Sequence, residues 1–220
     1  SHLEDSIELI RKSFEDGSLT KTQFGEMVSV ITESAVIVGS NLNRAADLVK
    51  AFKAVAVDQS SAEPRLFALG PYVEDILTSL RPKLKRTMHD ITLDIGENIE
   101  LFCDPGLFSQ IISNLVMNSL HHAFTPGQVG HIKISAQQSG DILHFTYTDD
   151  GSGIEETILN RLFDPFVTTK RGQGGSGLGT HIIYNLVTQG LGGRIQCFSE
   201  LGKGVRFDIT LPVTSAQDMI

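Results

Sequence analysis

Apolar residues near the start of the chain recur in alternating steps of four and three, which is a 3.5-residue repeat. This repeat is typical of long helices that pack in a coiled coil or a helical bundle. A short polar stretch at residues 15–20 divides the repeat into two sets. The sets are Leu3, Ile7, Ile10 and Phe14, and then Phe24, Val28, Ile31, Ala35, Val38, Leu42, Ala45, Val49, Phe52 and Ala56.

The polar stretch carries the signals of a turn between two helices. Gly17 predicts a helix end, because glycine readily adopts the left-handed conformation found just past a helix C-terminus. Thr20 and Gln23 have the spacing of a capping box for the helix that follows. The pattern therefore predicts an antiparallel helical hairpin over residues 1–57.

The two predicted helices differ in length, roughly 20 Å for the first and about 50 Å for the second at 1.5 Å per residue. The far half of the second helix thus has an apolar stripe with no partner in this sequence. We expect a homodimer and missing upstream turns of the first helix to cover it together. The alternative is a lone helix that packs on the C-terminal domain.

The pattern changes after a polar linker at residues 58–64, which breaks the repeat and ends in Pro64. From residue 65 to 213, alternating runs typical of strands are interspersed with runs of helical period, and residues 214–220 form a tail. Helices on one face of a mixed sheet give a two-layer α/β sandwich, so the fold class is α+β. Strands are expected at 65–69, 91–95, 100–104, 132–136, 142–148, 193–198 and 205–211, and those at 132–136 and 142–148 are expected to form a hairpin around Ser139-Gly140. Helices are expected from about residue 71, from about residue 105, at 155–162 and from 180 to about 189. The helix from residue 105 is expected to bury the face that carries Ile111, Leu115 and Val116.

Composition narrows the environment and the partners. A formal net charge of −8 argues against nucleic acid or an anionic membrane as the main partner. Cys103 and Cys197 lie in apolar, strand-like runs, which favours buried reduced thiols and a cytoplasmic location. No run reaches the ~18 apolar residues of a membrane helix, so we expect no direct membrane contact by this part. A membrane anchor upstream stays open.

The densest glycine run is Lys170–Gly179, with five glycines between Gly172 and Gly179. Glycine lets a backbone approach an anion closely, and a helix predicted from Thr180 would add unpaired N–H groups. The run formally matches the dinucleotide fingerprint, but no strand precedes it and it lacks the Walker-A ending. A flexible lid over phosphates fits the run better.

Two further groups of polar residues suggest chemistry. Asn114 and Asn118 are four apart and so share a helix face, where an amide oxygen can ligate Mg²⁺; surface or capping asparagines are the alternative. Asp149 and Asp150 end a predicted strand and enter a glycine turn. A carboxylate there can accept a hydrogen bond from the amino group of a base, although a plain Asp-Gly turn has the same pattern.

Together these residues resemble the histidine-kinase-like ATPase family, and more closely the sensor histidine kinases of two-component systems. The resemblance covers roughly residues 65–212, and the helical hairpin resembles the dimerisation domain of that family. Asp150 stands where asparagine is commoner. The matching segments, in family order, are the N box at 110–119, the first glycine box at 149–153, the F box at 163–166, the second glycine box at 175–179 and a last glycine box at 202–207.

The resemblance implies an ATP site. Asn118 would hold Mg²⁺ on the phosphates with support from Asn114, and Asp149 would bind the adenine amino group. Lys170 would neutralise the γ-phosphate. His121 or His122 would lie near the nucleotide, unless they are solvated residues at a helix end. The implied nucleotide-binding residues are Asn114, Asn118, His122, Asp149, Gly151, Gly153, Lys170, Gly175, Ser176, Gly177, Leu178 and Gly179. Phe163 and Phe166 would pack the lid shut, which is a structural role.

The family's phosphate acceptor is a histidine on the first dimerisation helix, followed by an acidic residue and often a proline. No such motif is present, because His2 is followed by Leu3 and His89 lies just before a predicted strand. The resemblance thus implies an ATP-binding catalytic fragment that transfers the γ-phosphate to a histidine outside this sequence, for relay to a response-regulator aspartate. We expect it to bind ATP without phosphorylating itself. A hydrolytic relative would need a glutamate base where Asn114 stands. A non-enzymatic dimeric scaffold with a vestigial pocket is the other alternative.

Overall fold

The computed structural model describes residues 2–57, 63–85, 87–169 and 176–213, with the backbone alone for residues 2–6, 9–10, 40 and 43–57. The chain forms two compact units that divide at residue 50, and each is described by itself. No helix in the described part of the chain is both long and apolar enough to cross a membrane.

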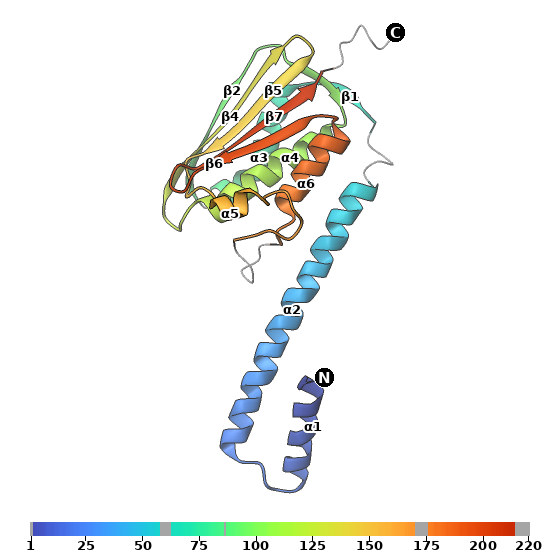
Figure 1. Cartoon of the computed structure of the whole chain (residues 1–220), viewed down its shortest axis with the longest axis vertical. Helices are drawn as coiled ribbons and strands as arrows, with labels where there is room; N and C mark the ends of the chain where they lie inside the picture. Colours follow the sequence, from blue (N-terminus) through green and yellow to red (C-terminus); the bar gives the residue numbers. More distant parts are fainter. Residues whose placement is uncertain (1, 58–62, 86, 170–175, 214–220) are drawn as a thin grey trace. The chain divides into compact units, whose positions relative to one another are not determined.

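The N-terminal unit contains the helix α1 (His2–Glu15) and most of α2 (Lys21–Val57), joined by a tight turn (Figure 1). Gly17 has a φ of 66°. The Ser18 N–H donates to the Ser13 carbonyl at 2.9 Å and the Gly17 N–H to the Phe14 carbonyl at 3.1 Å. These two bonds make a Schellman motif, so Gly17 ends the first helix as predicted.

The second helix begins with the predicted capping box. The Thr20 N–H donates to Gln23 Oε1 at 2.9 Å, and the Gln23 N–H donates to Thr20 Oγ1 at 3.3 Å. The two residues thereby satisfy backbone donors that a helix start leaves without intrahelical partners. Local hydrogen bonding therefore fixes the point where α2 starts.

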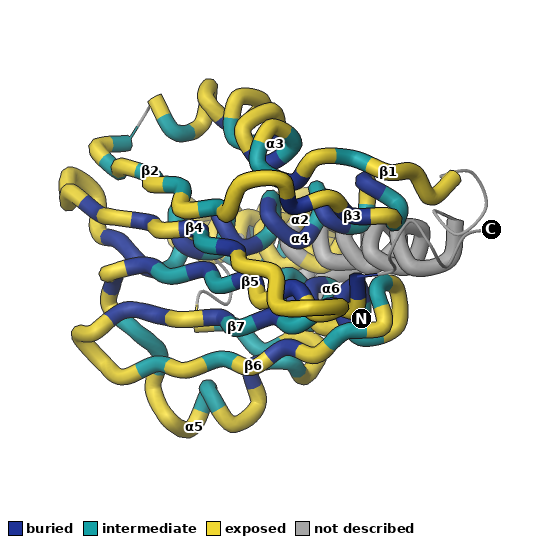
Figure 2. Tube along the Cα trace, turned by 90° about the horizontal axis from the view of Figure 1, so that it is seen from above, coloured by how far each residue is buried: buried dark blue, intermediate teal, exposed yellow. Residues whose placement is uncertain are grey.

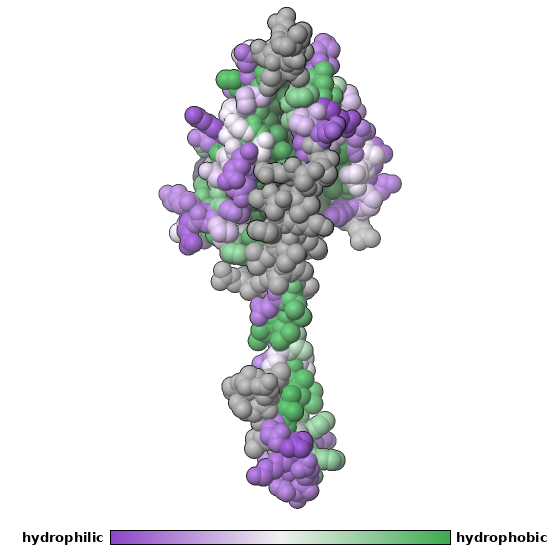
Figure 3. Space-filling view, turned by 90° about the vertical axis from the view of Figure 1, so that its right-hand side faces the viewer, coloured by the Kyte–Doolittle hydropathy of each residue, from purple (hydrophilic) through white to green (hydrophobic). Residues whose placement is uncertain are grey.

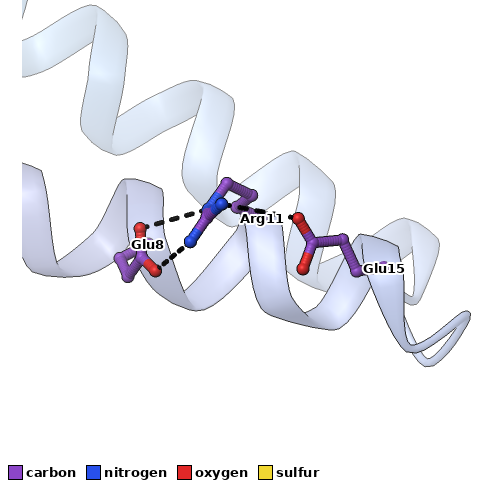
Figure 4. Close-up of polar contacts among 3 residues, drawn as sticks. All are labelled: Glu8, Arg11 and Glu15. Carbon is purple, nitrogen blue, oxygen red and sulfur yellow. Dashed lines mark hydrogen bonds and ion pairs between the residues drawn. The ribbon is translucent and has the colours of Figure 1, made fainter.

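The polar face of α1 carries a chain of ion pairs (Figure 4). Arg11 binds Glu8 through two nitrogens, Nη2 at 2.6 Å and Nε at 3.2 Å, and it approaches Glu15 at 3.6 Å. The hydrogen bond from Arg11 lowers the pKa of Glu8. These side chains are exposed, so they mark a solvated face and add little to stability.

An apolar stripe on α2 is exposed along the part of the helix whose side chains are described. Phe24 is 56% exposed and Leu42 is 66% exposed, and hydrophobic atoms, drawn green, gather along this helix (Figure 3). The exposed members of the predicted repeat on α2 are Phe24, Val28, Ile31, Ala35, Val38 and Leu42. The later members, from Ala45 to Ala56, lie outside the described side chains.

The C-terminal unit is built on a five-stranded sheet of order β2-β4-β5-β7-β6. β2 pairs with β4 in parallel, and the other neighbours are antiparallel. The sheet is therefore mixed, as predicted. Its strands are β2 (Met88–Ile95), β4 (Val129–Ser139), β5 (Ile142–Asp149), β6 (Arg194–Ser199) and β7 (Val205–Pro212); a separate pair joins β1 (Arg65–Ala68) to β3 (Glu100–Cys103).

The helices α3 (Leu69–Leu84), α4 (Pro105–Asn118) and α6 (Gly179–Asn185) of the C-terminal unit cover one face of this sheet (Figures 1 and 2). Strand residues alternate between buried and exposed along β4 and β5, which is the pattern of a sheet with one covered face. Phe108 packs edge-on against Phe145, with ring centroids 5.4 Å apart. The other helical elements are α5 (Glu156–Leu159) and the π-helical turns η2 (Ser119–Ala123) and η3 (Leu186–Gly190). The structure is the predicted two-layer α/β sandwich.

Two helices differ from the predicted spans. α5 ends at Leu159, because the N–H groups of Arg161 and Leu162 bond to carbonyls three residues back rather than four. The helix predicted from Thr180 to Gln189 begins at Gly179 and changes to a π-helical turn after Asn185. Both changes lie next to the glycine-rich segments.

Candidate nucleotide site

The C-terminal end of α4 lies against the start of α6. A Cβ atom built on Gly179 would lie 2.9 Å from Asn118 Oδ1. The two residues are far apart in sequence and belong to the predicted N box and second glycine box. The structure therefore brings together the two segments that the phosphate hypothesis requires on one side of the molecule.

The side chain of Asn118 has unused hydrogen-bonding capacity. Its Nδ2 atom is buried and has no hydrogen-bond partner among the described residues. A buried polar group without a partner is costly, and such groups in native proteins call for an explanation. A phosphate oxygen next to Asn118 would accept a hydrogen bond from Nδ2, and the amide oxygen Oδ1 could ligate a cation. The residue therefore fits the role that the resemblance implies.

Asn114, one turn earlier on α4, is held differently. Its Nδ2 donates to the Gln110 carbonyl at 3.0 Å, within the same helix. The side-chain oxygen remains available as an acceptor. No group of three His, Cys, Asp or Glu side chains in the described ranges could hold a metal ion. A Mg²⁺ ion here would depend on few protein ligands and on phosphates, which is the usual arrangement for this ion.

Asp149 lies at the end of β5 and is only 7% exposed. Ser119 Oγ donates to its Oδ2 at 2.6 Å, and the Gly151 N–H donates to its Oδ1 at 3.1 Å. Burial raises the pKa of Asp149, and the hydrogen bonds from Ser119, Gly151 and Val205 oppose that rise. The carboxylate of Asp149 is thus a buried hydrogen-bond acceptor at the first position of the first glycine box.

Ser119 and Tyr147 belong to this site and were missed by sequence reasoning. Tyr147 Oη donates to Ser119 Oγ at 2.8 Å, and both residues are buried. Ser119 is the first residue of η2, directly after Asn118. A tyrosine at an inward position of a strand signals a polar partner in the core, because its hydroxyl needs one.

Three glycines hold the first glycine box in tight contact with its neighbours. A side chain at Gly151 would overlap Ala123, and one at Gly153 would overlap the Glu200 carbonyl. Gly153 and Gly204 also have positive φ values of 70° and 75°. The box is therefore clamped between η2 and the β6–β7 turn, and these positions accept only glycine without rearrangement.

Asp150 is tied to the sheet. Its Oδ1 accepts the His131 N–H at 2.6 Å, and its own N–H donates to the His131 carbonyl at 3.1 Å. These bonds fix the turn that follows Asp149. The carboxylate that departs from the family pattern thus has a structural partner.

A hydrogen bond joins the residues on the two sides of the segment 170–175. The Phe166 N–H donates to the Gly177 carbonyl at 2.8 Å, and both residues have positive φ, 68° and 69°. Ser176 Oγ accepts the Leu178 N–H at 3.3 Å. Lys170 and Gly175 lie outside the described residues.

Further contacts attach the segment 163–169, which precedes the glycine-rich run, to the rest of the domain. His122 Nδ1 lies 3.1 Å from Thr169 Oγ1, which links η2 to the start of the lid. Phe163 packs against Tyr184 and Phe207, with ring centroids 5.3 Å and 6.5 Å apart. Phe163 therefore has a packing role, whereas Phe166 is 46% exposed.

The first turn of α6 is anchored to the segment after α5. Thr180 Oγ1 donates to the Leu162 carbonyl at 2.6 Å, and His181 Nδ1 lies 2.9 Å from the Phe163 carbonyl. Because a carbonyl can only accept, Nδ1 of His181 carries the proton. These bonds fix the first turn of α6 relative to the segment after α5.

Residues 103–215, more than half of the 220 residues, match the family described as histidine kinase-, DNA gyrase B- and HSP90-like ATPase. The chain belongs to this ATPase family. The sensor kinase CckA of Brucella abortus is 34% identical over 188 residues, which cover 78% of this chain and 19% of CckA. The sensor histidine kinase ZraS of Escherichia coli K12 is 39% identical over 114 residues, which cover 52% of this chain and 23% of ZraS.

Solved structures of this ATPase family agree with the fold. The catalytic domain of the histidine kinase ThkA is 26% identical, with a TM-score of 0.61, over 70% of this chain and 99% of that domain. The histidine kinase AdeS of Acinetobacter baumannii, at 20% identity and a TM-score of 0.60, shows the fold over 97% of this chain and 98% of its own. The chain spans about a fifth of the length of the curated relatives CckA and ZraS.

Proposed function

We propose that this chain is the ATP-binding catalytic part of a sensor histidine kinase, which transfers the γ-phosphate of ATP to a histidine. The observation that carries the proposal is the contact between Asn118 and Gly179, where Nδ2 of Asn118 has no hydrogen-bond partner in the described part of the chain. The next residue, Ser119, bonds to Asp149. Consecutive residues at the junction of α4 and η2 thus reach the two places where the phosphates and the base of one nucleotide would bind.

Each part of the site has a role in holding ATP. Asp149 accepts a hydrogen bond from the adenine amino group beside Gly151 and Gly153. Asn118 holds Mg²⁺, which neutralises phosphate charge when bound, and Asn114 supports it. The phosphates meet Lys170 and the segment Gly175, Ser176, Gly177, Leu178 and Gly179. Positioning and electrostatic support of the transferred phosphoryl group account for most of catalysis in such reactions.

The proposed partners follow from the kinase assignment. We place a second copy of the chain on the exposed apolar stripe of α2, and a response-regulator receiver domain as the phosphate recipient. Among proteins of similar fold, ThkA in complex with the response regulator protein TrrA supports the receiver domain, and ShkA in complex with AMPPNP supports nucleotide binding. They are 19% and 20% identical to this chain. We propose a cytoplasmic location for this part of the protein.

A hydrolytic activity is disfavoured by the residue at position 114. The hydrolytic relatives place a water-activating glutamate there, whereas the amide of Asn114 cannot remove a proton and donates to the Gln110 carbonyl. The site therefore suits transfer to an acceptor rather than activation of water.

Mg²⁺-dependent ATP binding tests the proposal. Calorimetric titration with ATP should show binding that weakens strongly when EDTA removes Mg²⁺, and Asn118→Ala should lose this dependence. Asn160→Ala, at an exposed asparagine after α5, is the matched control and should bind as the unaltered protein does. Absence of ATP binding by the folded, unaltered protein would overturn the proposal and favour a scaffold.

A second measurement addresses the acceptor. The chain incubated with γ-labelled ATP should acquire no acid-labile, base-stable label by itself, because neither His2 nor His89 has the acceptor motif. Label should appear on an added acceptor-histidine fragment from a related kinase. Self-labelling would show that the expected absence of an acceptor is wrong.

A further inference from the structure

Three buried polar groups form a hydrogen-bonded row that ends on Asp149. Tyr147 Oη donates to Ser119 Oγ at 2.8 Å, and Ser119 Oγ donates to Asp149 Oδ2 at 2.6 Å. Tyr147, Ser119 and Asp149 are 0%, 3% and 7% exposed. The row joins β5 to η2 through side chains alone.

The direction of donation along the row is fixed. Ser119 has a single hydroxyl hydrogen, and an ionised carboxylate only accepts, so Ser119 gives its hydrogen to Asp149. Ser119 must then accept from Tyr147. Burial raises the pKa of the Tyr147 phenol, which keeps that donor protonated. Every hydrogen in the row therefore points toward the carboxylate.

The row limits what Asp149 can still bind. A carboxylate offers about four acceptor positions. Ser119 occupies one, and the Gly151 N–H occupies another. The acceptor positions that are left for a ligand can receive only a donor.

We propose that Ser119 and Tyr147 are positioning residues that make the site select a 6-amino purine over a 6-oxo purine, by holding Asp149 as a fixed acceptor. This inference rests on the proposed function. Adenine presents an N–H donor at position 6, whereas hypoxanthine presents a carbonyl oxygen that another acceptor repels. A site whose buried polar group is left unpaired by the wrong ligand discriminates strongly against that ligand.

Removal of the Ser119 hydroxyl would weaken this selection in two ways. Asp149 Oδ2 would lose the partner that fixes the rotation of the carboxylate and would gain a free acceptor position. Tyr147 would become a buried donor without its acceptor. The carboxylate could then turn to receive the N1–H of hypoxanthine, which adenine lacks.

The test compares ATP with ITP, which differ at position 6 of the base. Dissociation constants for both nucleotides in Mg²⁺ are measured by calorimetry for the unaltered protein and for variants. Ser119→Ala should lower the preference for ATP over ITP about tenfold, the size expected for one hydrogen bond to a charged group. Ser119→Thr keeps the hydroxyl and should restore the preference.

Tyr147→Phe keeps the ring and removes only the donor, so it should lower the preference by about threefold. Thr146→Val is the matched control. Thr146 is the neighbour of Tyr147 on β5, and its Oγ1 donates to the carboxylate of another residue, Asp208, at 3.1 Å. Thr146→Val should leave the ATP-to-ITP ratio unchanged. If Ser119 had only a structural role, Ser119→Ala would weaken the binding of ATP and ITP equally and would leave the ratio of their affinities unchanged.

The outcomes separate this inference from the proposed function. An unaltered protein that fails to bind ATP overturns the proposed function and this inference with it. If the unaltered protein binds ATP with Mg²⁺ and Ser119→Ala has the same ratio of ATP to ITP affinity, only the inference is overturned. Should Ser119→Ala fail to fold, Tyr147→Phe decides: a lowered ratio supports the inference, and an unchanged ratio overturns it.

Discussion

Replacing Gly179 with alanine would place a methyl group in the space beside Asn118. The new Cβ would lie 2.9 Å from Oδ1, 3.4 Å from Nδ2 and 3.6 Å from Cγ of Asn118. The backbone at Gly179 is not in the left-handed region, so alanine suits it. Because Thr180 and His181 anchor the first turn of α6, the amide of Asn118 is the group that must move.

The size of the movement sets the expected effect. Real Cβ atoms essentially never lie within 3.0 Å of another heavy atom, so Asn118 Oδ1 must move by about 0.5 Å to reach an ordinary contact. A functional site loses efficiency at about this displacement, and Mg²⁺ demands near-ideal geometry. We expect Mg²⁺-dependent ATP affinity to fall about tenfold, or ~1.4 kcal/mol. Stability should change by less than about 1 kcal/mol, because alanine favours the helix and the displaced group is a side-chain end.

Calorimetric titration with ATP, with and without Mg²⁺, and thermal unfolding measure the two effects separately. Gly70→Ala is the matched control: Gly70 lies in the first turn of α3, and its built Cβ would meet only Ile95 Cγ2, at 3.9 Å. It should leave ATP affinity unchanged. If folded Gly179→Ala bound Mg²⁺ and ATP as tightly as the unaltered protein, Asn118 would not hold the metal ion and the reasoning would be refuted.

Three further predictions concern other residues. Asn118→Ala should lose more Mg²⁺-dependent ATP affinity than Asn114→Ala, without loss of folding stability. The reason is that Nδ2 of Asn118 has no partner among the described residues, whereas Nδ2 of Asn114 bonds within its helix. Equal losses of ATP affinity in calorimetric titrations would contradict the assigned roles. Phe166→Gly should raise the unfolding free energy by about 1 kcal/mol, because Phe166 has a φ of 68° and is 46% exposed; a lower melting temperature in calorimetry would show that its side-chain packing outweighs the strain. Burial raises the pKa of Cys103 to about 11 and that of Cys197 to about 12, so both thiols stay protonated at pH 8 and should react slowly with iodoacetamide in the native protein; rapid labelling seen by mass spectrometry would refute this.

Features decided by neighbouring residues could be predicted from the sequence. The turn at Gly17 and the capping box of Thr20 with Gln23 depend on contacts within six residues, and the structure confirms both. The hairpin of β4 and β5 is confirmed for the same reason, with Gly140 at a φ of 59° in its turn. Periodicity also identified the face of α4 that packs in the core.

Features decided by distant contacts could not be predicted. α5 is shorter than expected, and the Leu162 carbonyl after it accepts Thr180 Oγ1, a residue that spacing cannot relate to it. The contact of Asn118 with Gly179 followed only from the family resemblance. Ser119 was overlooked because serine after asparagine carries no signal until its contact with Asp149 is known. The roles of Lys170 and Gly175 stay predictions.

The parallel pairing of β2 with β4 has a consequence for how the sheet opens. Ile91 pairs with Ile132, whereas the antiparallel pair of β4 and β5 turns back at Gly140. The connection from β2, which ends at Ile95, to β4, which begins at Val129, is much longer than a hairpin turn, so pairing these strands costs more chain entropy than closing a hairpin. In addition, β2 lies at the edge of the sheet. We expect the amides of β2 to exchange with solvent through local opening well before those of β5. None of the proposed ATP-contacting residues lies on β2, so this edge can separate and re-form while a bound nucleotide stays in place.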